Sequence, residues 1–399
     1  MGGSEVQETV IVSGCRTPFG SFGGSLKDIP ASDLGALVIR EALGRARLAG
    51  DQVQYVLMGM VVQAGAGQSP ARQAALKAGI PPHVPSETIN KVCASSLRCV
   101  NIADALIRAG DLEVAVVGGM ENMSRGPYLV PGARWGYRLW NQTLVDATVN
   151  DGLWCALHDV HMGVHADRVA REYGVGRKEQ DAWAYRSHVR ALEAIRAGRL
   201  KEEIVPVEVP QRKGPPAVFD TDESPRPDTS PEKLAALKPV FLPDGTITAG
   251  NAPGINDGAA ALVVMSRRKA EELGLEPMAT IVSQGWVSRP PEEFPLTPYP
   301  AARVALEKAG LSFADVDLIE VNEAFAAVAL VNMKLGDWPE EKVNVNGGAV
   351  ALGHPIGASG ARILLTLAYE LRRRGGGLGV ACLCAGGGQG EATVIRVEP

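Results

Sequence analysis

The sequence lacks the long apolar run, the basic run and the dense cysteine pattern of membrane, nucleic-acid-binding and secreted proteins. No apolar stretch approaches the roughly 18 residues of a membrane-spanning helix, and MGGSEVQETV has neither region of a signal peptide. Lysine and arginine total 40 against 45 aspartates and glutamates, which argues against a nucleic-acid partner. The 6 cysteines lack disulfide-framework spacing. We therefore expect a cytoplasmic protein without a membrane partner.

Three common catalytic signatures are also missing. The sequence has no GxGxxG after a strand, no Walker loop with its lysine and no GxSxG elbow. Their absence argues against dinucleotide-dependent dehydrogenases, NTPases and α/β-hydrolases.

The chain is long and unusually rich in glycine. Its 399 residues exceed the about 250 to 300 residues at which one hydrophobic core stops growing, so at least two cores are expected. Its 46 glycines exceed the usual share of about 7%. Short β-branched runs alternate with longer amphipathic runs, which is typical of α/β architecture.

The C-terminal part repeats the order of the N-terminal part. Val53 to Val56 matches Val316 to Ile319 at an offset of 263 residues. Val114 to Gly119 matches Gly379 to Ala385 after a drift of about two residues, as a structural repeat allows. Amphipathic helices also resemble one another by chance, but the shared order of elements favours two similar α/β halves.

A segment of different composition separates the two halves. Pro206 to Pro231, within this segment, is rich in proline, aspartate and arginine. The whole segment has about 120 residues, and so long an insertion within a compact domain is usually functional. We predict an N-terminal half over residues 1–125 completed by 246–275, an inserted lobe over 126–245, and a C-terminal half over 276–399.

Cys93 is the first candidate for chemistry. It follows an apparent strand, Glu87 to Val92, and precedes a helical run, Leu97 to Arg108. At a helix N-terminus the unpaired N–H groups and the helix dipole lower the pKa of a thiol, so we expect an available thiolate. A lone cysteine is more often inert packing, so this interpretation needs a partner group.

The second half offers such partners at the ends of its strands. His354 lies on a glycine-rich turn before a helix, in the place that the repeat sets opposite the Cys93 turn. Cys384 leads into a glycine run with Gly386, whose bare N–H groups suit an oxyanion. Asn322 also ends a strand. If the halves pack by pseudo-symmetry, these groups converge on Cys93.

Two other arrangements of candidate residues compete with this one. His158, His161 and His165 have the spacing of one helix face and so suggest zinc, but no carboxylate completes a recognised spacing. Cys382 and Cys384 suggest a redox pair, but alternate residues on a strand point to opposite faces, so a disulfide between them would be strained.

Five separated motifs together identify a family. They are NKVCASSLRC (Asn90 to Cys99), GNAPGINDGAAA (Gly250 to Ala261), NEAFA (Asn322 to Ala326), NGGAVALGHPIGASGAR (Asn346 to Arg362) and CAGGGQG (Cys384 to Gly390). In this order, and over essentially the whole chain, the set resembles the thiolase family. The resemblance implies two pseudo-repeated βαβαβαββ halves in an α/β/α/β/α core, with an inserted loop domain.

The resemblance also implies an acyltransferase mechanism. Cys93 resembles the nucleophile that becomes an acyl thioester, and His354 resembles the base that activates it. Cys384 resembles the second cysteine, which moves the α-proton. Asn322, through a water, and His354 resemble one oxyanion hole, and the N–H groups of Cys93 and Gly386 resemble the other. The implied reaction is condensation of two acetyl-CoA molecules to acetoacetyl-CoA, or thiolysis of 3-ketoacyl-CoA.

The inserted lobe is expected to bind coenzyme A. No tightly bound cofactor and no metal is implied, the substrates are CoA thioesters, and the family suggests a homodimer or homotetramer. Pro253, Lys233 and Phe294 depart from the acetoacetyl-CoA pattern, which leaves the acyl-chain preference open. The positions that resemble pantetheine and nucleotide contacts are Leu153, His161, Met162, Arg226, Phe241, Ala249 and Phe325.

Three rival functions follow from the same motifs. One is a longer-chain 3-ketoacyl-CoA thiolase of fatty-acid β-oxidation. A β-ketoacyl synthase is disfavoured by Cys384 and by the lack of a second matching histidine. A non-catalytic CoA- or lipid-binding protein of this fold is disfavoured because Cys93, Asn322, His354 and Cys384 are all present.

Overall fold

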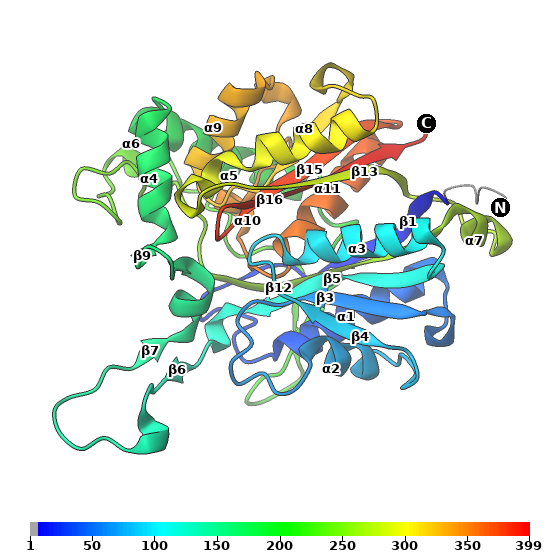
Figure 1. The fold of residues 1–399 in the computed structure, drawn as a ribbon, viewed down its shortest axis with the longest axis horizontal. Coiled ribbons are helices and arrows are strands. Elements are labelled where there is room, and N and C mark those ends of the chain that lie inside the picture. Colours follow the sequence, from blue (N-terminus) through cyan, green and yellow to red (C-terminus); the bar gives the residue numbers. More distant parts are fainter. Residues whose placement is uncertain (1–6) are drawn as a thin grey trace.

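One mixed β-sheet organises the protein, and helices cover and separate its two halves (Figure 1). The computed structural model describes residues 7–399. The sheet has ten strands in the order β14-β15-β16-β13-β1-β12-β5-β3-β4, with β2 paired to β12. Its strands are β1 (Thr9–Arg16), β2 (Gly20–Ser21), β3 (Tyr55–Gly59), β4 (Ser86–Ile89), β5 (Val114–Asn122), β12 (Asn256–Ser266), β13 (Ala279–Ser288), β14 (Leu318–Val321), β15 (Gly377–Ala385) and β16 (Gln389–Val397).

The two halves of the sheet have the same internal pairing. In the first, β3 pairs parallel with β4 and β5, and β5, β12 and β1 continue antiparallel. In the second, β14 pairs parallel with β15, and β15, β16 and β13 continue antiparallel. A parallel bridge between Ile319 and Val343 stands where β4 stands in the first half. The halves join where Thr9 pairs with Ile281.

The sequence repeat is confirmed, with one correction. Residues 318 and 377, which begin β14 and β15, follow the starts of β3 and β5 at 55 and 114 by 263 residues each. The expected two-residue drift is wrong, because β15 already begins at Gly377. The match expected from Gly379 to Ala385 therefore omits the first two residues of this strand.

Helices form three layers around the two half-sheets, so the predicted thiolase-type α/β/α/β/α architecture is confirmed. α3 and α11 lie between the halves and contact strands of both, while α1 and α2 cover the outer face of the first half and α8 covers that of the second (Figure 1). The helices are α1 (Ala31–Ala46), α2 (Pro70–Lys77), α3 (Ser95–Ala109), α4 (Met162–Glu172), α5 (Arg177–Arg196), α6 (Pro231–Ala235), α7 (Arg267–Glu272), α8 (Pro298–Lys308), α9 (Ala326–Gly336), α10 (Ala349–Leu352) and α11 (Ser359–Arg373).

The segment between the halves carries short hairpins and the helices α4 to α6. After it, the chain returns as β12, which lies between β1 and β5. None of the helices in residues 7–399 is long and apolar enough to cross a membrane. The division into 1–125 with 246–275, 126–245 and 276–399 stays a prediction. The short strands are β6 (Tyr128–Leu129), β7 (Val145–Asp146), β8 (Trp154–Cys155), β9 (Val160–His161), β10 (Val207–Val209) and β11 (Ala217–Phe219).

Candidate active site

A strained turn between β4 and α3 presents Cys93. Val92 has a φ of 49°, a left-handed conformation that a β-branched residue rarely adopts. The Ser95 hydroxyl holds the turn, since it donates to the Val92 carbonyl at 2.6 Å and accepts from the Lys91 N–H at 2.9 Å. Strain of this kind persists only where the surroundings enforce it, and it is common at functional sites.

Three turns from different parts of the chain meet at one cavity of about 300 Å³. Cys93 comes from the β4–α3 turn, His354 from the α10–α11 turn and Gly386 from the β15–β16 turn, and all three line the cavity. The structure therefore brings together groups that lie almost 300 residues apart in sequence. The convergence expected from pseudo-symmetry is observed for these three.

The expected depression of the Cys93 pKa is wrong. Burial raises the pKa of the Cys93 thiol to about 12, although the N–H groups of Cys93 and Gly386 oppose the shift. The helix α3 begins only at Ser95, and desolvation of a thiolate outweighs the helix dipole. Cys93 is therefore a neutral thiol at rest and needs a base.

His354 meets the requirements of that base. Burial, and then the charge of Arg362, lower the pKa of His354 to about 3, so its imidazole is neutral. Its Nδ1 lies 2.5 Å from the Ser359 Oγ, and the Ser359 hydroxyl donates to the Pro355 carbonyl at 2.8 Å. Because the only hydroxyl proton of Ser359 is used there, Nδ1 must be the donor to Ser359. Nε2 is therefore the unprotonated nitrogen, and the Asn322 amide lies beside it.

Asn322 and Cys384 lie behind the cavity lining. Both are fully buried, and the Asn322 Nδ2 lies 3.4 Å from the His354 Nε2. Burial raises the pKa of Cys384 well above its ordinary value, and the charge of Cys93 raises it further. The electrostatic coupling between the two thiols means that a change in the charge of one alters the acidity of the other.

The seven predicted coenzyme A positions all line one of two connected cavities. A second, outer cavity of about 430 Å³ contains Arg226 and Ala249 and shares Ala252, Gly254 and Ile255 with the inner cavity. The inner cavity contains Leu153, His161, Met162, Phe241 and Phe325. The path from the outer cavity, whose lining includes the charged residues Glu223, Arg226, Asp228 and Lys233, to Cys93 thus has an apolar inner section.

Aromatic side chains shape that inner section. His161 stacks on Phe241 with ring centroids 4.4 Å apart, and Phe325 meets Phe241 edge-on at 6.0 Å. Pro253 and the buried Phe294 line the same cavity. Lys233 lines the outer cavity, where its ammonium pairs with Asp228 at 2.8 Å. The three departures from the family pattern thus all lie along the path.

Three residues that position the site were not singled out from the sequence. Ser359 orients His354, and Asn256 accepts from the His354 N–H at 3.0 Å. The buried Glu121 carboxylate accepts from the N–H groups of Val61 at 2.9 Å and Gly357 at 2.9 Å. Ser359 and Asn256 lie within recognised motifs, but as ordinary turn and strand residues they carry no separate signal.

The three histidines His158, His161 and His165, whose spacing suggested zinc, do not form one group in the structure. His161 faces the active-site cavity, whereas His158 lies close to His165 with 3.3 Å between Nδ1 and Nε2. The helix α4 begins only at Met162, so the three histidines do not share a helix face. Cys382 and Cys384 are both free and buried on β15.

The fold and the comparisons together define an acyltransferase. The model of the thiolase N-terminal domain matches residues 9–268, and that of the thiolase C-terminal domain matches residues 275–397. The chain therefore belongs to the thiolase family.

Individual relatives agree over almost the whole length. An acetyl-CoA acetyltransferase of Pseudomonas aeruginosa is 53% identical over 391 residues, which cover 98% of this chain and 99% of that protein. One of Cupriavidus necator is 52% identical over 390 residues, with 98% and 99% covered. The crystal structure of the Bacillus anthracis acetyl-CoA acetyltransferase superposes with a TM-score of 0.96 at 44% identity, covering 98% of this chain and 99% of that one.

Proposed function

We propose that the chain is an acetyl-CoA C-acetyltransferase that reversibly condenses two acetyl-CoA molecules to acetoacetyl-CoA through an acyl-Cys93 intermediate. The observation that carries the proposal is the single cavity shared by Cys93, His354 and Gly386, which is connected to a polar outer cavity that contains Arg226. Full-length relatives at about half identity bear the same activity in their names.

Acyl transfer to Cys93 begins with His354. The unprotonated Nε2 takes the Cys93 proton, and the thiolate attacks the carbonyl carbon of acetyl-CoA. The N–H groups of Cys93 and Gly386, which both line the cavity, hold the oxyanion in this proposal. The carbon–sulfur bond to coenzyme A then breaks, and the departing thiolate takes the proton of Cys384. One thioester replaces another, so the step is close to balanced in energy.

Carbon–carbon bond formation uses the resulting Cys384 thiolate. It takes the α-proton of the second acetyl-CoA, and the protonated His354, with a water held by Asn322, stabilises the enolate oxygen. The carbanion attacks the acetyl group on Cys93, and Cys93 leaves as a thiolate that recovers its proton from His354. Acylated Cys93 carries no charge, so the ionised Cys384 that the step needs does not face a neighbouring thiolate.

Neither step of this mechanism uses a bound cofactor, and none of the residues named in it acts as a metal ligand. The cavity has a buried Phe294 in its wall, which supports a short acyl group. Thiolysis rates across 3-ketoacyl-CoA substrates should fall as the chain lengthens, and a preference for long chains would assign the protein to β-oxidation instead. The compartment and the homodimer or homotetramer stay predictions.

The two half-reactions separate in a Cys384→Ala variant. It should still transfer one acetyl group to Cys93, although more slowly because the departing thiolate loses its proton donor, but it should form acetoacetyl-CoA at less than about 1% of the normal rate, since loss of a general base costs about 10²- to 10⁴-fold. Cys382→Ala is the matched control, because Cys382 is an equally buried thiol two residues away. Normal condensation by the Cys384 variant would remove that residue from the mechanism.

A further inference from the structure

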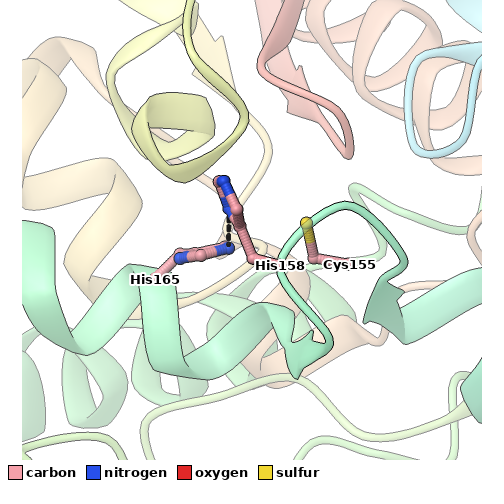
Figure 2. A group of neighbouring side chains, drawn as sticks. All are labelled: Cys155, His158 and His165. Carbon is pink, nitrogen blue, oxygen red and sulfur yellow. Dashed lines mark hydrogen bonds between the residues drawn. The ribbon is translucent and has the colours of Figure 1, made fainter.

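A second group of reactive side chains lies outside the active-site cavities. Within residues 7–399, Cys155, His158 and His165 each offer one ligand atom, and these three atoms lie within 4.8 Å of one another. Figure 2 shows the two imidazoles nearly perpendicular, with one nitrogen of each facing the other and the Cys155 sulfur beside them. The mechanism uses none of the three.

The local fold explains why these residues meet. β8 ends at Cys155 and pairs with β9, so the chain between them forms a tight hairpin that contains His158. A φ of 52° at Asp159 closes the turn, and the Trp154 indole N–H donates to the Asp159 carboxylate at 2.9 Å. α4 starts directly after β9, which sets His165 against the hairpin. His165 is 1% exposed and Cys155 is 5% exposed.

The spacing of the two imidazoles suits a tetrahedral metal ion. The His158 Nδ1 and the His165 Nε2 are 3.3 Å apart. Two nitrogens bound to zinc at about 2.0 to 2.1 Å with a tetrahedral angle lie about 3.3 Å apart. A hydrogen bond between two imidazoles gives a similar distance. The Cys155 sulfur and the other groups nearby therefore decide whether the two histidines bind a metal ion or only each other.

A carboxylate supports the metal interpretation. The His158 Nε2 lies 3.7 Å from the Glu292 Oε2. Metal-binding histidines nearly always donate their second ring N–H to a carboxylate, carbonyl or water, which fixes the tautomer. At 3.7 Å the two groups are not hydrogen-bonded, but the carboxylate charge favours the proton on Nε2 of His158, which leaves the Nδ1 lone pair facing His165. The site thus offers one thiol and two imidazoles as ligands, with the Glu292 carboxylate next to one of the imidazoles.

We propose that Cys155, His158 and His165 bind one zinc-class divalent cation, with water in the fourth position. Binding releases the Cys155 thiol proton to solvent, because the thiolate is the ligand. The ion would tie the hairpin to α4, and Glu292 would extend the link to the segment Pro291–Leu296, which carries Phe294. The hairpin is flanked by the cavity residues Leu153 and Met162, so the ion stabilises one wall of the cavity without entering the reaction.

Metal titrations of the full chain test this site, which does not rest on the proposed function. A Cys93→Ser parent, stripped with chelator, excludes binding at the catalytic thiol. Zn²⁺ alone should bind with a stoichiometry of one per chain, raise the midpoint of thermal unfolding and protect residues 154–165 from hydrogen exchange. Co²⁺ alone should give a thiolate-to-cobalt absorption band and the intense visible bands of a tetrahedral site.

Matched variants locate the ion. Glu292→Gln should weaken Zn²⁺ binding about 10- to 100-fold, the usual effect of an outer partner, and His158→Ala or Cys155→Ser should weaken it more. His158 is exposed, so its loss does not threaten folding, and the exposed His83 provides the control His83→Ala, which should bind normally. Stoichiometric binding that survives both His158→Ala and Cys155→Ser, a cobalt spectrum without the thiolate band, or no stoichiometric binding in the parent would overturn the proposal.

Discussion

Ser359 is a positioning residue for His354, and its removal tests the tautomer argument. In Ser359→Ala the His354 Nδ1–H loses its acceptor at 2.5 Å in a fully buried setting. Nothing then holds the proton on Nδ1, and the other tautomer carries it on Nε2, where it blocks proton transfer from Cys93. The imidazolium formed during acylation also loses a charge-assisted hydrogen bond.

The magnitude follows from the difference between the two states. A hydrogen bond to a charged group contributes about 1.5 to 3 kcal/mol, against about 1 kcal/mol for a neutral pair. The difference of about 0.5 to 2 kcal/mol corresponds to a fall of about 2- to 30-fold in kcat, at 1.36 kcal/mol per tenfold. KM should change less than about threefold, because Ser359 does not line either cavity.

Steady-state thiolysis of acetoacetyl-CoA measures both parameters. Ser283→Ala is the matched control, because its buried hydroxyl donates to the Ala305 carbonyl at 2.6 Å in β13, away from both cavities. Both variants should lose similar stability, but only Ser359→Ala should lose turnover. An unchanged kcat in Ser359→Ala, or an equal loss in Ser283→Ala, would refute the orienting role.

Two further predictions concern stability. Burial, and then the charge of Arg226, lower the pKa of His188 to about 4. Below about pH 6.5 the unfolded chain therefore binds more protons than the folded chain, so the free energy of unfolding falls as the pH falls. Between pH 7 and pH 5 this residue alone lowers the free energy of unfolding by about 2 kcal/mol. In urea unfolding, the free energy of unfolding of His188→Gln should therefore fall by about 2 kcal/mol less than that of the parent between pH 7 and pH 5. Identical pH profiles of the two proteins would contradict the lowered pKa of His188. A Cβ at Gly119 would lie 1.9 Å from the Gly357 carbonyl oxygen, so Gly119→Ala should destabilise the fold by about 1 to 3 kcal/mol or more and lower activity. Gly44→Ala, with open space around it in α1, should instead stabilise by about 0.5 to 1 kcal/mol, and equal effects of the two in thermal unfolding would count against the close approach.

Much of the fold was predictable because its signals are local and repeated. The runs at Val53 and Val316 carry the same apolar order at one offset, and β3 and β14 form at those positions. Cys93 and His354 stood out because each lies on a turn before a helix, where a side chain is presented rather than packed.

What the sequence could not supply depends on burial and on long-range packing. The Cys93 pKa moves in the opposite direction to the helix argument because desolvation, which no local pattern shows, is the largest effect. His161 lies apart from the other two histidines of the expected helix face because Val160 and His161 form a strand that pairs with β8 and are not part of α4. That same hairpin brings in Cys155, which no helical spacing connects to His165.

Mass spectrometry of the acyl-enzyme tests the central claim most directly. The enzyme is mixed with acetyl-CoA, quenched in acid and digested. The account predicts one added acetyl group on the peptide that contains Cys93, lost again when free coenzyme A is added before the quench. An unmodified Cys93 peptide with acetyl on another residue, or full turnover with no acyl-enzyme at any time, would contradict it.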